Sequence, residues 1–333
     1  GLALGRWPGL AVDRTGIAIL GAVAMLATGR LDLDEAQAAL DMPTLAVLFG
    51  MMLLSVQVQA SGLYAALAER LAQTRNPRHL LAGVIVAVAA LSAVLTNDVV
   101  CLALTPLIVT GVVRAGLPPM PFLLAIACAS NIGSALTPIG NPQNIVIAQS
   151  LGLAFGPFVL ACSVPVVGSL LVLYIWLRRQ IGGTTSRDSA AGASSGGPLP
   201  PTILVPHVPL NRWQASKALG LTVLTIVLFL TPIPAALTAL AVGGVVLLSR
   251  QVTTRERLAL VDWPLLMLFS RLVVVIRGFE HGGGVTALAQ WLTSSGLALA
   301  DPWLFTPTVL ILSNAVSNVP AVLLLMPILP ASA

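Results

Sequence analysis

The chain has 333 residues, of which 57% are hydrophobic and only 9% are charged, and its mean hydropathy is +0.95. A water-soluble domain of this length needs far less apolar material for its core, so the composition excludes a soluble protein. The apolar runs are long enough to cross roughly 30 Å of hydrocarbon as helices, and they lack the alternating pattern of barrel strands. We therefore expect an all-α polytopic membrane protein in a lipid bilayer.

Six apolar runs, taken in chain order, are typical of transmembrane helices. They cover residues 15–29, 43–60, 155–177, 214–232, 234–249 and 262–278. Polar residues interrupt three further apolar stretches, which lie at 79–113, 119–152 and 303–333. These three stretches need a separate explanation.

The basic residues are distributed asymmetrically along the chain. If the amino end is cytoplasmic, all Lys and Arg except Arg30, Arg271 and Arg277 fall on cytoplasmic segments. The positive-inside rule then predicts this orientation. It also accounts for the net charge of +5 without nucleic acid as a partner. Residues 182–212, which begin with a Gly-, Ser- and Pro-rich run, are expected to form a cytoplasmic linker.

Two parts of the sequence repeat at a constant separation. Asp41 in the first part is matched by Asp262 in the second. At the same separation, Asn97 in the segment LTNDVVCLALTP is matched by Asn318 in the segment VSNVPAVLLLMP. We call this separation the repeat offset. A register kept over this length without a gap predicts a duplication. Because an odd number of crossings separates the two copies, the second copy should be inverted, which is typical of secondary transporters.

The duplication divides the chain into a first repeat at 1–181, the linker at 182–212 and a second repeat at 213–333. Applied to the helix that begins near residue 214, the repeat offset predicts a matching helix that begins before residue 1. Applied to the broken helix, it predicts a second broken helix beyond residue 333. We therefore expect a chain truncated at both ends, in which half of the repeated site is missing.

The stretch 79–113 consists of two apolar arms of about 16 residues, and 303–333 has the same arrangement. At about 1.5 Å per residue each arm reaches roughly 24 Å, slightly short of a full crossing. This length predicts two re-entrant hairpins. Two ordinary tilted spans with a turn at the far surface are the alternative.

Polar residues mark the tips of both hairpins. We expect Asn97 and Asn318 to cap the second arm of each hairpin, although such residues can also serve only as turn residues. Asp98 is the only carboxylate in the expected membrane interior, so it is a candidate ligand for a coupling cation or a candidate proton acceptor. The alternative for Asp98 is an acid that only stabilises the helix dipole.

The stretch 119–152 contains the segment NIGSALTPIGNPQN, which predicts a broken helix. We expect Asn131 and Gly133 to end its first half, and Asn141 to cap its second half with Pro142 at the first helical position. Backbone groups freed in this way must be buried against protein or line a wet cavity. The free helix ends attract ions.

The matched hairpins, and above all the segment ASNIGSALTPIGNPQNI at 129–145, resemble the ion transporter superfamily. The resemblance is strongest to its arsenite permease and citrate transporter-like branch, which is related to divalent-anion:sodium symporters. It covers nearly the whole chain, and it is not specific to a substrate. It implies a scaffold that forms a homodimer, and a mobile part made of the hairpin and the broken helix.

The resemblance also implies which residues bind substrate and ion. They are Thr96, Asn97, Asp98, Asn131, Gly133, Thr137, Gly140, Asn141, Asn144, Ser317 and Asn318. Among these, Asn97, Asp98, Asn131 and Asn141 are the candidates for Na⁺.

Together these features predict a secondary active transporter of a small anion or an oxyacid such as arsenite, coupled to Na⁺ or H⁺ in a bacterial inner membrane. No cofactor is expected. The alternatives are an Na⁺/H⁺ antiporter, a passive channel, or a permease assisted by a separate ATPase. An enzyme is not expected, because no clustered acids, histidines or activated nucleophile are present in the sequence.

Overall fold

The computed structural model describes residues 12–184, 209–248, 253–295 and 301–328, and every regular element in these ranges is a helix. The chain divides into two compact units, which we describe separately. One consists of Gly1–Leu48 with Asp262–Ala333, and the other of Phe49–Val261. The all-α class is confirmed. Most of the expected linker and the last residues of the second hairpin lie outside the described residues.

In the first unit, α1 packs along α14, and α2 also contacts α14. Ala22, Leu31, Ala36 and Val274 form an apolar core between these helices. The helices of this unit are α1 (Arg14–Ala27), α2 (Leu33–Ala39), the start of α3 (Met42–Ala60), α14 (Trp263–His281), α15 (Gly284–Ser294), α16 (Pro302–Val316), α17 (Asn318–Leu325) and a 3-10 turn (Met326–Ile328).

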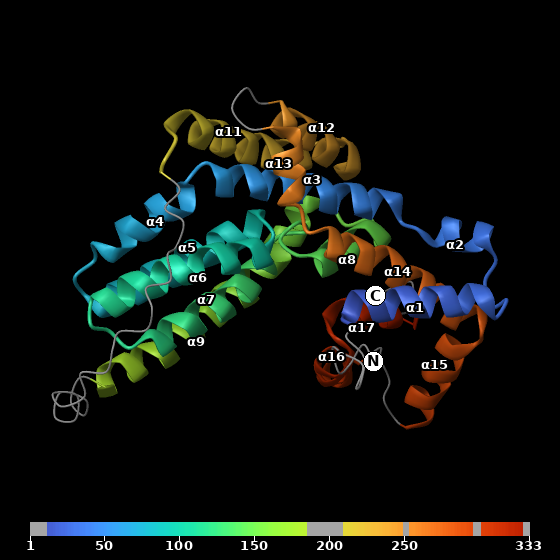
Figure 1. Cartoon of the computed structure of the whole chain (residues 1–333). Coiled ribbons are helices and arrows are strands. Elements are labelled where there is room, and N and C mark those ends of the chain that lie inside the picture. Colours follow the sequence, from blue (N-terminus) through green and yellow to red (C-terminus); the bar gives the residue numbers. More distant parts are fainter. Residues whose placement is uncertain (1–11, 185–208, 249–252, 296–300, 329–333) are drawn as a thin grey trace. The chain divides into compact units, whose positions relative to one another are not determined.

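In the second unit, α5, α6 and α7 lie side by side, and α9 packs against α5 and α7 (Figure 1). This unit also contains the rest of α3. Its other helices are α4 (Leu63–Ala72), α5 (Pro77–Val94), α6 (Asn97–Arg114), α7 (Pro119–Ser134), α8 (Pro142–Ser150), α9 (Phe155–Thr184), α11 (Arg212–Phe229), α12 (Ala235–Leu247) and α13 (Thr254–Ala259).

Each of the six expected spans coincides with one helix, namely α1, α3, α9, α11, α12 or α14. Four helices of the described chain are long and apolar enough to cross a membrane: α3, α5, α6 and the part of α9 at Phe155–Ile181. These helices are consistent with a multi-pass membrane protein. The sequence did not predict α2, α4, α13 and α15, because their apolar pattern is too short to separate from the neighbouring loops.

The helix boundaries keep the repeat offset. The first and last residues of α3 and those of α14 are separated by the repeat offset. The same offset separates the first residue of α4 from that of α15, and the first residue of α6 from that of α17. Gly62 and Gly283, which precede α4 and α15, both have a left-handed backbone, with φ of 78° and 74°. An ordinary residue would be strained at either position. These matches support the expected duplication, while its inverted arrangement stays a prediction.

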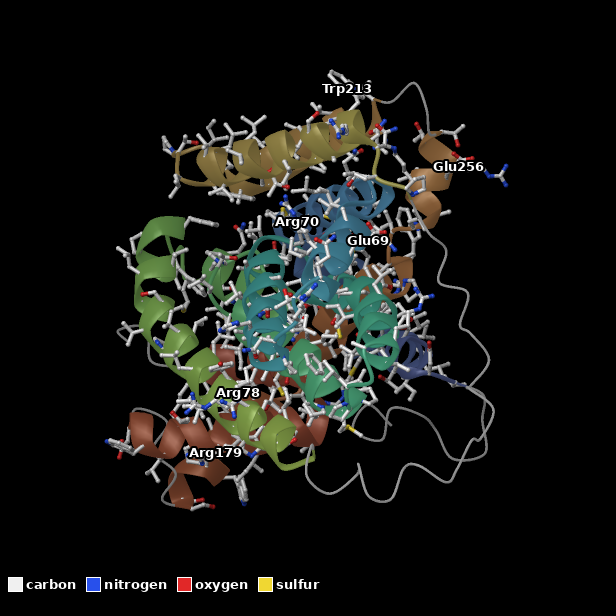
Figure 2. The ribbon with its side chains drawn as sticks, turned by 90° about the vertical axis from the view of Figure 1, so that its left-hand side faces the viewer. Glu69, Arg70, Arg78, Arg179, Trp213 and Glu256 are labelled. Atoms are coloured by element: carbon white, nitrogen blue, oxygen red, sulfur yellow. The ribbon has the colours of Figure 1, made fainter. Side chains whose placement is uncertain are left out.

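Basic side chains lie at helix ends in the second unit. Arg78 near the start of α5 and Arg179 near the end of α9 are both exposed (Figure 2). Trp213, near the start of α11, is 72% exposed. Residues of these types at helix ends are typical of the membrane interface. The side of the membrane on which they lie stays a prediction.

Arg257 on α13 is the largest fully buried side chain in the described chain. Its Nη1 donates to Oε1 of Gln57 at 2.5 Å and to the carbonyl of Val246 at the end of α12. Gln57 on α3 donates in turn to Oε1 of Gln214 on α11 at 2.9 Å. Burial lowers the pKa of the Arg257 guanidinium. This network joins α3, α11, α12 and α13 within the second unit.

Replacing Gln57 by Leu should destabilise this unit, because it removes an acceptor from a buried guanidinium. A hydrogen bond to a charged group contributes about 2 kcal/mol, so we expect the free energy of unfolding to fall by about that amount. Thermal unfolding of the detergent-solubilised protein measures the change. Gln59→Leu is the matched control, because Gln59 is exposed on the same helix. Equal unfolding midpoints for the two variants would contradict the proposed contribution of the network.

Candidate functional site

The tip between α5 and α6 consists of Leu95 and Thr96. Thr96 occupies the position before α6, and its side chain does not cap the helix. Its backbone N–H and its Oγ1 instead donate to Oγ of Ser55 on α3, at 3.2 and 3.1 Å. The expectation that Asn97 caps α6 is therefore wrong. Asn97 is already the first helical residue, one position too late to act as the cap.

Asn97 is held in place through its backbone. Its N–H donates to the carbonyl of Gly140 at 3.4 Å, and its carbonyl accepts from Oγ of Ser130 on α7 at 2.9 Å. Oγ of Ser92 on α5 donates to Oγ of Ser130 at 3.3 Å. Within the described ranges no hydrogen bond is made by the side-chain amide of Asn97, which is 9% exposed. This amide is therefore available to a ligand.

The expected broken helix is present, because α7 ends at Ser134 and α8 begins at Pro142. Asn141 caps α8 as expected, since its side chain accepts from the N–H of Asn144 at 2.8 Å. The expectation that Asn131 and Gly133 end the first half is slightly wrong. Both lie in the last turn of α7, because the helical hydrogen bonds continue up to Ser134.

Side chains satisfy backbone carbonyls that the break sets free. Nδ2 of Asn144 donates to the carbonyl of Thr137 at 2.9 Å and to that of Ser134 at 3.2 Å. Nδ2 of Asn141 donates to Oγ of Ser134 at 3.1 Å. The hydroxyl of Thr137 donates to the carbonyl of Ala93 near the end of α5. The break is thus bonded both to itself and to the first hairpin.

Four helix ends therefore meet in the second unit: the carboxyl ends of α5 and α7 and the amino ends of α6 and α8. Amino ends carry partial positive charge and carboxyl ends partial negative charge, so this place offers groups to both anions and cations. Among the residues that the structure describes, no group of three or more His, Cys, Asp or Glu could hold a metal ion. We call this convergence the four-end site.

The structure places the expected residues differently around the four-end site. Thr96, Asn97, Thr137 and Gly140 are buried in it, and Asn141 and Asn144 are half-buried at the start of α8. Asp98 and Asn131 are exposed, in the first turn of α6 and the last turn of α7. Gly133 is buried where α7 crosses α5.

Ser317 and Asn318 belong to the other unit. Asn318 is the first residue of α17 and does not cap it, so the second cap expectation is also wrong. Ser317 occupies the cap position with φ of 82° and ψ of 160°, and its side chain makes no capping hydrogen bond. Ser317 is the single described non-glycine residue with positive φ.

Four serines of the four-end site were missed by the sequence reasoning: Ser55, Ser92, Ser130 and Ser134. Each lies in an otherwise apolar helix, where a hydroxyl commonly bonds to the carbonyl one turn earlier and has no further role. The sequence carries no signal that separates these serines from ordinary ones. Only the contacts between helices identify them.

A polytopic helical chain with an interrupted helix, and with four helix ends meeting in its packed interior, belongs to the class of membrane transporters. The sequence profile of the citrate transporter family, CitMHS, matches residues 2–333. The chain therefore belongs to the citrate transporter family.

Individual relatives are also named as transporters or membrane proteins. The silicon efflux transporter LSI3 of Oryza sativa subsp. japonica is 36% identical over 190 residues, which cover 55% of this chain and 39% of that protein. The putative transporter arsB of Dictyostelium discoideum is 33% identical over 163 residues, which cover 49% of this chain and 28% of that protein. The inner membrane protein YbiR of Escherichia coli is 30% identical over 303 residues, which cover 89% of this chain and 73% of that protein. The chain thus matches less than half the length of the first two.

Replacing Gly133 by Ala should separate α5 from α7, because the added Cβ would overlap the backbone of Ala89. Overpacking of this kind costs about 2 kcal/mol, and we expect a lower unfolding midpoint together with reduced transport. Gly168→Ala is the control, since a Cβ at Gly168 on α9 meets nothing within 4 Å. If Gly133→Ala unfolds at the same temperature as Gly168→Ala, the close crossing is not needed.

Replacing Ser317 by Gly should stabilise the protein, because the backbone at Ser317 lies in a region that mainly glycine adopts. We expect the free energy of unfolding to rise by about 1 kcal/mol, measured as a higher unfolding midpoint. Ser313→Gly in α16 should do the opposite, because glycine is less favourable than serine inside a helix. A lower midpoint for both variants would refute the strain at Ser317.

Proposed function

We propose that this chain forms the transport part of a secondary active transporter that moves a small oxyacid or anion, driven by a gradient of Na⁺ or H⁺. The convergence of four helix ends carries the proposal. A site of this kind binds polar solutes inside a membrane without exposing backbone groups to lipid. The hydroxyl, amide and backbone groups of the four-end site can exchange protein partners for ligand atoms as the hairpin and the broken helix move. Alternating access requires such an exchange.

A small neutral oxyacid fits the chemistry of the four-end site best. The side chains that make its described contacts are hydroxyls and amides, and no Lys or Arg is among them. Arsenite and dissolved silicon are uncharged hydroxyl-bearing acids near neutral pH, so hydroxyl, amide and backbone groups can satisfy them. Citrate carries several negative charges and would need bound cations to compensate them. The name of the rice relative supports a silicon oxyacid as one test substrate.

The position of the first hairpin tip supports a re-entrant hairpin. Its arms have 18 residues each, about 27 Å, so their length alone also fits two full crossings. Thr96, however, is bonded to Ser55, which lies 13 positions after Met42, about 20 Å along α3. Two full crossings would instead place the turn near the level of Met42. The contact with Ser55 therefore favours a tip that lies within the depth of α3.

The coupling cation is proposed to lie near the carboxyl ends of α5 and α7. Carbonyl groups at helix carboxyl ends attract cations. The side chains of Asn97, Asp98, Asn131 and Asn141 are the further candidate ligands. Asp98 would supply the one carboxylate of this set, and it would bind either Na⁺ or a proton.

Membrane placement and assembly complete the proposal. We infer a bacterial inner membrane, as the name of the relative YbiR suggests. We infer a cytoplasmic amino end from the distribution of basic residues. We also infer a homodimer, from the resemblance to transporters whose scaffolds dimerise. Long α9 exposes large apolar side chains such as Leu160, Val164 and Val172, which suit contact with lipid or with a second copy.

An Na⁺/H⁺ antiporter is the second candidate function, favoured by the acidic side chain of Asp98 in the first turn of α6. Asp98→Asn separates the two functions. In an antiporter it should abolish proton exchange, whereas an Na⁺-coupled oxyacid transporter should keep substrate flux with a changed ion dependence. A passive channel or an ATPase-assisted permease would show flux that ignores both ion gradients.

The central test is flux in proteoliposomes that contain the chain with any sequence flanking it in its gene. We expect uptake or efflux of arsenite, silicic acid or citrate that depends on an imposed Na⁺ or proton gradient. Asn97→Ala should reduce this flux to the level of empty liposomes, with an unchanged unfolding midpoint, because the backbone contacts of Asn97 remain.

Asn76→Ala is the matched control for this test. Asn76 is exposed and caps the opposite end of α5, far along the chain from the tip. We expect this variant to keep most of the flux. Flux that is indifferent to both gradients would refute coupled transport, and full flux in Asn97→Ala would refute the assigned site.

A further inference from the structure

Ser55 is the point where α3 meets the tip of the first hairpin. It is fully buried, and its Oγ donates to the carbonyl of Met51 at 3.0 Å. The same oxygen accepts from the N–H and from the hydroxyl of Thr96. A hydroxyl has one proton to donate and two lone pairs to accept, so all the hydrogen-bonding capacity of Ser55 is used.

These bonds are not required to form a helical hairpin of this kind. Ile276 corresponds to Ser55 through the repeat offset, at the matching position of α14, and it has no hydroxyl. The second hairpin, α16 and α17, nevertheless forms. Its tip residue Ser317 has φ of 82°, whereas Thr96 has φ of −62°. The bonds of Ser55 therefore go with the extended conformation of the first tip, and they are not needed for a hairpin to form.

The conformation of Thr96 sets the direction of the next residue. With Thr96 extended, α6 begins at Asn97, whose N–H reaches Gly140 and whose carbonyl reaches Ser130. The free amide of Asn97 is thereby oriented within the four-end site. Of the residues proposed to bind ligand, Ser55 is hydrogen-bonded to Thr96 alone within the described chain.

We propose that Ser55 is a positioning residue of the four-end site, which acts through Thr96 to set the affinity for ion and substrate. The inference rests on the proposed transport function and extends it to a residue outside the expected site. Removing the Ser55 hydroxyl leaves two donors of Thr96, which is 5% exposed, without their acceptor. These donors must then find other partners, and the tip with Asn97 shifts away from its binding geometry.

The test compares three variants in the same proteoliposomes. In Ser55→Ala the half-saturating concentrations of Na⁺ and of the transported oxyacid should rise about tenfold, while the maximal rate stays within about twofold. Ser55→Thr keeps the hydroxyl and should restore most of the affinity. Ser61→Ala is the matched control, because Ser61 is equally buried just after α3 but its hydroxyl bonds only to Val58 and Leu63.

A coupling test covers the case in which Ser55→Ala lowers stability. If Ser55 acts through Thr96, the loss caused by Ser55→Ala should be smaller in a Thr96→Val background than in the wild-type background. Unfolding midpoints with and without Na⁺, arsenite, silicic acid or citrate report binding independently of flux. An additive double variant would overturn the proposal.

The failures of the two proposals are distinguishable. A wild-type protein without gradient-dependent flux refutes the transport function. A transporting wild type in which Ser55→Ala has the same half-saturating concentrations as Ser61→Ala refutes the positioning role alone. A wild type with neither flux nor a ligand-dependent shift of its unfolding midpoint refutes both.

Discussion

Backbone N–H and C=O groups that are buried away from water must be hydrogen-bonded, and in a bilayer a broken helix makes this requirement severe. The second unit meets it at the four-end site with short polar side chains. Asn144 and Thr137 bind carbonyls at the ends of α7 and α5, and Ser130 binds the carbonyl of Asn97. Because these bonds join different helices, the same contacts that satisfy the backbone also fix the positions of α5, α6, α7 and α8.

This way of satisfying the backbone leaves the site able to respond to a ligand. Hydroxyl and amide groups can change partners by rotating about a few bonds, whereas an ion pair buried at the same place would be costly to separate. The hydrogen bonds of Ser130, Thr137, Asn141 and Asn144 described above join neutral groups, so a ligand oxygen or a cation can replace one of these partners without uncovering a charge. A transporter that works by the alternating access proposed above needs this property, because it remakes such bonds in every cycle.

The sequence predicted the elements whose causes are local. Pro142 and Asn141 start α8 by fixed backbone geometry and a side-chain cap, so the broken helix could be placed from sequence. The six long apolar runs each coincide with one helix of the structure. The tip was mispredicted because Thr96 and Asn97 are both good cap residues, and Thr96 is held by Ser55, which is 41 residues away. Sequence spacing carries no information about such a contact. The roles of Ser92 and Ser130 were hidden for the same reason.

The two hairpin tips lie at positions matched by the repeat offset, but they differ in backbone conformation. At the first tip, hydrogen bonds to Ser55 hold Thr96 in an ordinary extended conformation, whereas the second tip holds Ser317 in a conformation that costs of order 1–3 kcal/mol. The coupling free energies that link two sites in a protein are of similar size. A difference of this magnitude between the tips is therefore large enough to make one hairpin easier to displace than the other. Matching helix boundaries at the repeat offset therefore do not make the two tips equal in backbone strain.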